Sequence, residues 1–247
     1  MNFLKYFYNK VLRFKFKQID FHHYDLDLIN GIFEHEFTKK ENLIKYILSY
    51  SSDSVNFIAE EERAFPGNDI FYKSGYYKTM LKRYFFAGAH FCNNKTVLDT
   101  CCGLGWGTYI ISQYAKDVTA FDLESKTIEF CKKEWKSSNV NWLSGNALDL
   151  NFLDKQMFDV ALAMETIEHF DKKDGEKYIE LLSKKIIENG ILIGTSAFPE
   201  TRDEAEKICS TNPYHFYIFT EKEMNTLLSQ YFKEYVIINN WMFIARK

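Results

Sequence analysis

Residues 97–107 read VLDTCCGLGWG, and this stretch decides the fold class. An apolar segment ends near Asp99, and three glycines follow before the next helical pattern: Gly103, Gly105 and Gly107. Glycines at such a point let the backbone turn tightly and approach a ligand closely. A second apolar segment ends in Asp122, about 20 residues after the first glycine, where an acid can accept hydrogen bonds from ribose hydroxyls. The stretch therefore predicts a strand, a ligand-binding turn and a helix.

Strands and helices alternate along the rest of the chain. Apolar runs predict strands at 95–102, 117–124, 139–145, 158–164 and 190–198, with a final strand pair at 234–247. Periodic segments predict helices at 108–116, 125–138, 171–190 and 220–232. This order predicts an α/β, Rossmann-like fold with a mostly parallel seven-stranded sheet and helices on both faces. Ligands bind such sheets outside the carboxyl ends of the strands.

Local signals predict where some of these elements begin and end. Ser125 is a candidate N-cap for the second helix, and Gly190 is a candidate terminator of the third. Thr220 and Glu223 have the spacing of a capping box. The dipeptide at 239–240, Asn-Asn, predicts the turn between the last two strands.

The first 90 residues have a different pattern, aromatic and irregularly helical, with a loop at 65–75 that holds one proline and two glycines. We therefore divide the chain into a helical lid region, residues 1–90, and a ligand-binding catalytic domain, residues 91–247. No low-complexity linker separates the two parts.

Composition excludes several classes of protein. The chain is 46% hydrophobic and 26% charged, which is globular, and its net charge of -3 argues against nucleic acid as a partner. An odd number of cysteines without a CxxC pair indicates reduced thiols in a cytoplasmic protein and argues against a zinc site. The cysteines are Cys92, Cys101, Cys102, Cys131 and Cys209.

The N-terminus lacks the apolar run of a signal peptide or of a membrane-spanning helix. Residues 1–17 are basic, with aromatic and aliphatic side chains at helical spacing. A basic amphipathic helix can lie on an anionic membrane surface. The same pattern also fits a helix packed on its own domain or on a second subunit, as in a dimer.

The spacing of the glycines and the residues beside them limit which ligand this turn can bind. A nicotinamide site would have the spacing GxGxxG, whereas this turn has GxGxG. Asp99 places a negative charge beside the turn, which would repel a pyrophosphate and suit a ligand with an amino group and a sulfonium. S-adenosylmethionine is such a ligand.

At this point the sequence resembles the class I methyltransferases over residues 95–200. VLDTCCGLGWG matches their first motif, Asp122 their second-strand acid, and SGNALDL, residues 144–150, their adenine-contacting loop. The resemblance implies that Asp99 binds the methionine amino group and Asp122 the ribose. The other cofactor-binding residues that it implies are Cys101, Gly103 and Gly105 through their backbone, Asn146 and Ala147 at the adenine, and Leu123 and Met164.

The segment before residue 90 is similar to the lead-in of methyltransferases of bacterial surface-glycan pathways, in which a helical lid covers the cofactor. Candidate lid residues are Arg63, Tyr76, Tyr77 and Arg83. Ordinary packing of aromatic helices is the alternative.

The catalytic candidates lie in METIEHF, residues 164–170, at the carboxyl end of the fourth strand. A helical turn here would place Glu165, Glu168 and His169 on one face, and His215 follows the fifth strand at the same sheet edge. Three readings stay open. The four residues bind a divalent ion such as Mg²⁺ or Mn²⁺, or a histidine oriented by Glu168 is a general base, or the group is structural. The ExxEH spacing resembles small-RNA 2′-O-methyltransferases and quinone-pathway O-methyltransferases.

We expect an S-adenosylmethionine-dependent O-methyltransferase that acts on a sugar hydroxyl, with a nucleotide-linked or surface-polysaccharide precursor as its partner. A quinone-type O-methyltransferase is the alternative, and an RNA ribose methyltransferase is disfavoured by the net charge. A module that only binds the cofactor would not need the acids and histidines of this edge.

Overall fold

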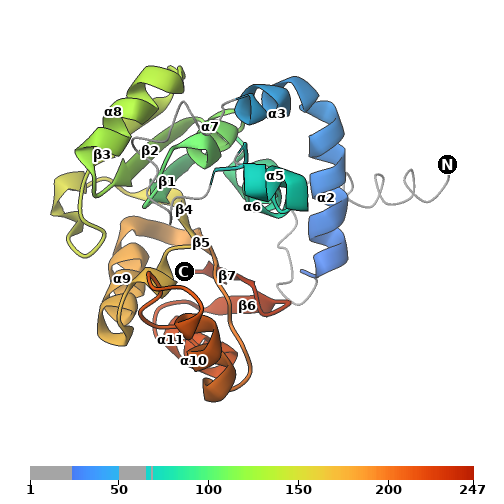
Figure 1. Ribbon diagram of the computed structural model, residues 1–247. Helices are drawn as coiled ribbons and strands as arrows, with labels where there is room; N and C mark the ends of the chain where they lie inside the picture. Colours follow the sequence, from blue (N-terminus) through green and yellow to red (C-terminus); the bar gives the residue numbers. More distant parts are fainter. Residues whose placement is uncertain (1–23, 50–64, 68) are drawn as a thin grey trace.

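The computed structural model describes residues 24–49, 65–67 and 69–247 (Figure 1). The basic segment at the N-terminus and the candidate lid residue Arg63 lie outside the described residues, so those two expectations stay predictions. In the parts that are described, no helix is long and apolar enough to cross a membrane.

One sheet of seven strands forms the centre of the molecule, in the order β3-β2-β1-β4-β5-β7-β6. Only β7 runs antiparallel, pairing with β5 on one side and β6 on the other. The strands are β1 (Thr96–Thr100), β2 (Asp117–Asp122), β3 (Val140–Ser144), β4 (Phe158–Met164), β5 (Ile186–Thr195), β6 (Glu234–Ile238) and β7 (Met242–Arg246). The predicted α/β fold with a mostly parallel sheet is confirmed.

Helices cover both faces of the sheet because consecutive strand residues point to opposite sides. Val97 of β1 belongs to one hydrophobic core and Leu98 to the other. The first core packs against α7 (Trp106–Ser112) and α8 (Ser125–Glu134), and the second against α9 (Lys172–Lys185) and α11 (Glu221–Leu228). Figure 1 shows α7 and α8 separated from α9 and α11 by the strands.

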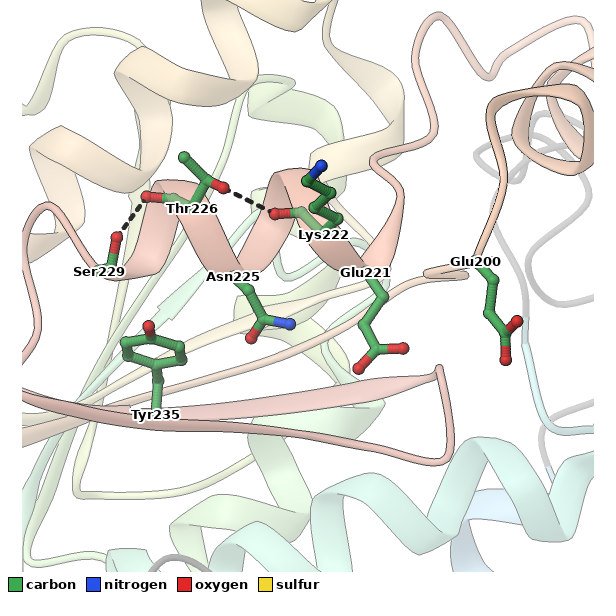
Figure 2. A pocket seen from close by; sticks show the side chains of 7 residues that line it. All are labelled: Glu200, Glu221, Lys222, Asn225, Thr226, Ser229 and Tyr235. Atoms are coloured by element: carbon green, nitrogen blue, oxygen red, sulfur yellow. Dashed lines mark hydrogen bonds between the residues drawn. The ribbon is translucent and has the colours of Figure 1, made fainter.

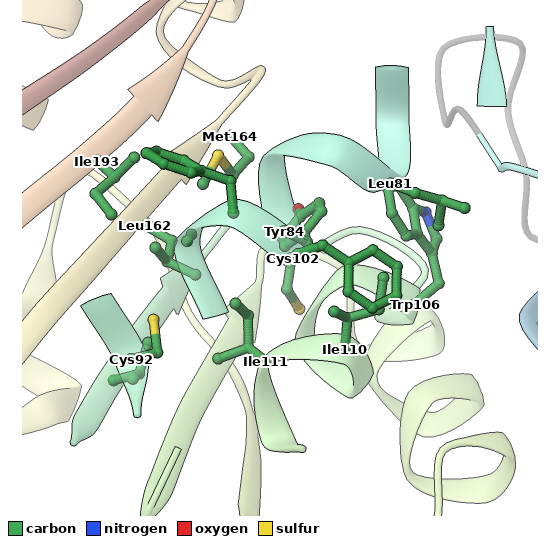
Figure 3. Close-up of a cluster of buried hydrophobic side chains, with 14 of the residues drawn as sticks. Leu81, Tyr84, Cys92, Cys102, Trp106, Ile110, Ile111, Leu162, Met164 and Ile193 are labelled. Atoms are coloured by element: carbon green, nitrogen blue, oxygen red, sulfur yellow. The ribbon is translucent and has the colours of Figure 1, made fainter. Parts of the chain in front are cut away.

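The described helices of the first 90 residues share the first core. They are α2 (Leu26–Lys39), α3 (Glu41–Leu48), α5 (Asp69–Ser74) and α6 (Tyr77–Ala87), followed by a π-helical turn, η2 (Gly88–Cys92). Leu81 and Tyr84 of α6 lie beside Trp106 and Ile110 of α7, and the labelled side chains of β4 and β5 lie to their left (Figure 3). α6 is thus a structural layer of the sheet as well as part of the region that we assign to a lid.

Two of the expected helix ends differ from the structure. Ser125 is the first residue of α8, and its N-cap, Glu124, makes no side-chain capping bond. Helix α9 ends at Lys185, and Gly190 lies inside the long strand β5, where a Cβ atom would come within 2.9 Å of the backbone oxygen of Asp159. Gly190 therefore allows β5 to lie close to the backbone of β4 and does not terminate a helix.

Two other local predictions are confirmed. Thr220 and Glu223 form both halves of the capping box at the start of α11. Asn239 and Asn240 have φ of 51° and 54°, the left-handed values of a tight hairpin turn between β6 and β7. A further helix, α10 (Arg202–Ser210), was not predicted, although Thr201 and Glu204 form a capping box at its start.

Candidate active site

The strand order places the glycine turn and METIEHF side by side. The chain leaves β1 for β2 and β3 on one side of the sheet and then returns to β4 on the other side of β1. β1 and β4 are parallel neighbours, with Asp99 opposite Leu162. A crevice opens at such a switch point beyond the carboxyl ends of the two strands. Both predicted constellations lie at this crevice.

The turn after β1 has the backbone conformation that its glycines allow. Gly103 and Gly105 have φ of 53° and 76°, and Cys101 has φ of 51°. A Cβ atom on Gly105 would come within 2.7 Å of the sulfur of Cys131, whereas one on Gly103 would meet nothing within 4 Å. Gly105 is therefore required for packing of the turn, and Gly103 leaves space beside the turn where a ligand can approach.

Gly107, the third glycine of the motif, has a different role. A Cβ atom there would come within 2.1 Å of the ring of Tyr84, which lies edge-on to Trp106 with 4.9 Å between ring centroids. Gly107 lets α6 pack closely on α7. Its place in the motif is explained by helix packing, and Tyr84 is a residue that the sequence did not single out.

Asp99 presents an unsatisfied acceptor at the crevice. The residue is 1% exposed, and Thr108 Oγ1 donates to Oδ2 of its carboxyl group at 2.6 Å. The other oxygen, Oδ1, is buried with no hydrogen-bond partner among the described residues. Burial raises the pKa of Asp99 to about 7, and the charge of Asp122 acts in the same direction. A ligand with an ammonium group would satisfy Oδ1 and favour the ionised form.

Asp122 fixes the turn from the end of the neighbouring strand. Its Oδ2 accepts from the backbone N–H of Gly103 at 2.9 Å, and its Oδ1 from that of Glu124 at 3.3 Å. Leu123, the next residue, is 70% exposed. The carboxylate thus holds the glycine turn in place, and its predicted contact with a ribose stays a prediction.

The predicted adenine loop follows β3, whose end lies beside that of β2, with Ser144 opposite Asp122. Asn146 is exposed, and its Oδ1 accepts from the backbone N–H of Leu148 at 2.9 Å. Ala147 is buried. On β4, Met164 is also buried and its sulfur accepts from Thr195 Oγ1 at 3.8 Å. The fold brings these residues to one edge, and their roles toward the cofactor remain predictions.

METIEHF does not form the continuous helical turn that we expected. Glu165 has φ of 51°, and a short 3₁₀ helix, η4, begins two residues later and spans Ile167–His169. Glu165 is not among the residues whose potential ligand atoms lie within 4.8 Å of one another. Glu165 instead forms an ion pair with the buried Arg83 of α6, with 2.7 Å between Oε1 and Nη1.

Glu168, His169 and His215 form the cluster that remains. One potential ligand atom from each lies within 4.8 Å of the others, and the two imidazole centroids are 5.3 Å apart. The loop that carries His215 is docked on η4, because Phe216 donates its N–H to the backbone oxygen of Glu168 at 2.8 Å. The contact between His169 Nδ1 and the backbone oxygen of Tyr214, at 3.0 Å, fixes the same junction.

Burial changes the protonation of this cluster. It raises the pKa of Glu168 to about 8, helped by the negative charge of Glu165, and Glu168 Oε2 has no partner in the described part of the chain. Burial also lowers the pKa of His215, with the nearby His169 acting in the same direction. At neutral pH the cluster therefore holds a neutral carboxyl group beside a neutral imidazole. Perturbed titratable groups of this kind are typical of active sites.

The candidate lid residues divide into two groups. Arg83 and Tyr76 face this edge: Arg83 binds Glu165, and burial together with the charges of Glu165 and Glu168 raises the pKa of Tyr76. Tyr77 instead stacks on Tyr72, with 5.2 Å between ring centroids. Arg63 lies outside the described residues.

A solvent-open cavity of about 450 Å³ lies elsewhere, between α11 and β6 (Figure 2). None of its lining residues belongs to the glycine turn or to the histidine cluster, and Figure 2 shows polar side chains of α11 beside Tyr235 of β6. The lining residues are Glu200, Glu221, Lys222, Asn225, Thr226, Ser229 and Tyr235. We assign no function to this cavity.

Comparisons with known proteins identify similar sequences and folds. Residues 97–190 match the family described as Methyltransferase domain. A fatty-acid O-methyltransferase of Mycolicibacterium smegmatis is 28% identical over 107 residues, 42% of this chain. The match spans 38% of that relative's length.

Solved structures share the fold. An O-methyltransferase family protein from Burkholderia thailandensis superposes with a TM-score of 0.57 at 13% identity, covering 91% of this chain and 74% of that protein. The N-methyltransferase NodS from Bradyrhizobium japonicum, in complex with S-adenosyl-l-homocysteine, gives 0.53 at 16% identity, covering 83% and 95%. The chain therefore contains a methyltransferase domain with the fold of the class I, S-adenosylmethionine-dependent enzymes.

Proposed function

We propose that this protein is an S-adenosylmethionine-dependent O-methyltransferase whose acceptor is a hydroxyl group of a sugar, on a nucleotide-linked or surface-polysaccharide precursor. The observation that carries the proposal is the pair of histidines beside Glu168, at the crevice that also holds the unsatisfied oxygen of Asp99. One group of residues fits the cofactor, and the other fits an acceptor that must lose a proton.

The protonation of the site favours a hydroxyl over a carboxylate. S-adenosylmethionine supplies a methyl group that its sulfonium has already activated. A carboxylate acceptor is ionised at neutral pH and needs no base. A hydroxyl has a pKa far above 7 and gains from a positioned proton acceptor, typically by about 10²- to 10⁴-fold. His169 is that acceptor in our proposal.

The surroundings of the cluster favour a sugar over a quinone. Phe216, the residue after His215, is 66% exposed and offers aromatic surface there. Tyr76, on which the charges of Glu165 and Glu168 act, is 42% exposed. Glu165 is partly exposed and can accept hydrogen bonds from further hydroxyls. A sugar ring combines one less polar face with several hydroxyls and matches this mixed edge. A quinone would favour a longer apolar pocket.

Each residue then has a defined task. Asp99 binds the amino group of the cofactor and the backbone of the glycine turn contacts it, while Asp122 holds that turn. His169 takes the proton of the acceptor hydroxyl as its oxygen attacks the methyl carbon. The Arg83–Glu165 ion pair connects α6 to this edge. Holding the acceptor in line is itself a large contribution, because positioned reactants avoid an entropic barrier.

Calorimetry with S-adenosylmethionine and with NAD tests the cofactor assignment. We expect binding of the former only, and the absence of S-adenosylmethionine binding would contradict the proposal. Methyl transfer should then be measured on nucleotide sugars, a hydroquinone and a fatty acid. Transfer to the fatty acid alone would contradict the hydroxyl assignment.

His169→Gln tests the proton acceptor. We expect a loss of about 100-fold or more in kcat on a hydroxyl acceptor, in line with general-base contributions. His35→Gln is the matched control, since His35 lies on α2, outside the candidate site, with its side chain 46% exposed. A His169→Gln variant with the kcat of the control would remove His169 from the chemistry.

A further inference from the structure

Asn212 was not singled out in the sequence, yet its hydrogen bonds determine what His215 can do. Asn212 lies three residues before His215, in the loop between α10 and α11. Its side chain makes two contacts, one with the backbone of Tyr214 and one with the imidazole of His215. The first contact fixes the orientation of the amide, and the second then fixes the imidazole.

The orientation of the Asn212 amide follows from the donor that it meets. The backbone N–H of Tyr214 donates to Oδ1 of Asn212 at 3.0 Å. A backbone N–H cannot accept a hydrogen bond, so the carbonyl end of the amide must face Tyr214. The amino end, Nδ2, therefore lies 3.1 Å from Nε2 of His215. Exchanging the two ends would place two donors, Nδ2 and the backbone N–H of Tyr214, against each other.

The proton of His215 follows from the same rule. Nδ2 of an amide is only a donor, so Nε2 of His215 must be the acceptor and carry the lone pair. A neutral imidazole has one proton, which must then lie on Nδ1. This nitrogen is buried and has no hydrogen-bond partner among the residues that the structure describes. His215 thus has an unsatisfied N–H donor at Nδ1, which a bound acceptor group would satisfy.

His169 has the complementary arrangement. Its Nδ1 donates to the backbone oxygen of Tyr214 at 3.0 Å, because a carbonyl oxygen can only accept. Nε2 of His169 is then the nitrogen with the lone pair. The cluster therefore combines an N–H donor from His215 with an acceptor from His169. A hydroxyl group is also one donor and one acceptor, so its hydrogen-bonding groups complement these two nitrogens.

We propose that Asn212 is a positioning residue that holds His215 as the Nδ1–H tautomer, which excludes His215 as a metal ligand and makes it a hydrogen-bond donor to the acceptor oxygen. A metal ligand needs a lone pair, and here the lone pair of Nε2 faces Asn212 while Nδ1 carries the proton. Of the four residues considered for a metal, Glu165 is paired with Arg83. Only Glu168 and His169 then remain as potential metal ligands, two of the four that the sequence suggested.

This inference rests on the proposed function only where it assigns His215 as a donor to the hydroxyl group of the methyl acceptor. The acceptor oxygen takes a hydrogen bond from His215 Nδ1–H while its own proton passes to His169 Nε2. The oxygen then forms its bond to the methyl carbon as the carbon–sulfur bond breaks, and His169 becomes a cation whose Nδ1–H is held by Tyr214. The tautomer itself does not depend on methyl transfer.

The test is ¹⁵N NMR of the full-length protein labelled at histidine, with His169→Gln and His215→Gln used for assignment. We expect both His169 and His215 as Nδ1–H tautomers at neutral pH. Asn212→Asp should convert His215 to the Nε2–H form, because a carboxylate keeps the bond from Tyr214 and now accepts from Nε2. Asn30→Asp on α2 adds the same charge elsewhere and should leave both tautomers unchanged.

A titration with Mn²⁺, followed by paramagnetic broadening of the same signals, tests the metal statement. We expect Asn212→Asp, with a lone pair now on Nδ1, to bind Mn²⁺ at His215 at least tenfold more tightly than the unmodified protein. An Nε2–H tautomer of His215 in the unmodified protein would overturn the inference, as would Mn²⁺ binding at His215 that Asn212→Asp does not strengthen. Both readouts are made without turnover, so a failed methyltransferase assay would leave them valid.

Discussion

The buried carboxyl group of Asp99 has opposite effects on stability and on binding, and Asp99→Asn separates the two. Burial raises its pKa from 3.8 to about 7. The folded pKa is thus above the unfolded one, so the stability that protonation provides is complete below pH 3.8 and is lost as pH rises through 7. A shift of about 3 units corresponds to about 4 kcal/mol of destabilisation above pH 7.

Asparagine removes that penalty and introduces a smaller one. Its Oδ1 can still accept from Thr108, and its Nδ2 takes the place of the unsatisfied oxygen of Asp99. A buried donor without a partner costs about 1–3 kcal/mol. We therefore expect Asp99→Asn to raise the free energy of unfolding by about 1–3 kcal/mol at pH 8, which is about 2–12 °C in Tm for a chain of this size. Near pH 5 the two proteins should be about equally stable.

Binding should change in the opposite direction. An ammonium group on a buried carboxylate contributes about 1.5–3 kcal/mol, so the variant should bind S-adenosylmethionine about 10- to 100-fold more weakly. Thermal unfolding at pH 5 and pH 8, with calorimetry at pH 8, measures both effects. The reasoning is refuted if the variant is less stable at both pH values, or if its affinity is unchanged.

Asp159→Asn is the matched control, because it makes the same substitution at the opposite end of the sheet. Thr96 donates to Asp159 Oδ2 through its backbone N–H at 2.9 Å and its hydroxyl at 2.7 Å. Burial opposes ionisation here, but these hydrogen bonds outweigh it and lower the pKa of Asp159. We expect this variant to be less stable than the unmodified protein at pH 8.

Two further predictions concern the contacts of α6. Gly107→Ala should destabilise the protein by about 1–3 kcal/mol through overpacking against the ring of Tyr84, and adding Tyr84→Leu should recover part of the loss in denaturant unfolding. An equal loss from Gly107→Ala in both backgrounds would contradict this contact. Glu165→Gln should leave the buried guanidinium of Arg83 uncompensated and destabilise by about 1–3 kcal/mol, with Arg83→Met/Glu165→Gln more stable than Glu165→Gln alone. Additive effects in this cycle would show that the ion pair is not coupled.

The fold was predictable because its signals are local and repeated. The apolar strands, the glycine turn and the capping box at Thr220 each depend on a few neighbouring residues. The errors arose where a distant contact decides the conformation. Gly190 has the look of a helix terminator, but close approach to the backbone of Asp159 explains it better.

The sequence was enough to predict which residues gather at the candidate site, but less so how they are arranged. The strand ends correctly placed Glu168, His169 and His215 together, since their elements share one sheet edge. Spacing alone could not show that Glu165 takes a left-handed conformation, because its partner, Arg83, comes from a helix 82 positions earlier in the chain. Asn212 was missed because the amide acts through its orientation, although the spacing Asn-x-x-His within a proline-containing loop is a signal that can be searched for.

The Arg83–Glu165 ion pair has a consequence for hybrid enzymes and for the divergence of relatives. A cation from the N-terminal segment neutralises an acid at the end of β4, so the two segments cannot be exchanged independently. A chimera that takes residues 1–90 from a relative with an apolar residue at position 83 would leave Glu165 without its partner, beside the histidines. New acceptor specificities that arise by recombination near residue 90 would therefore have to inherit both members of the pair, or lose both together.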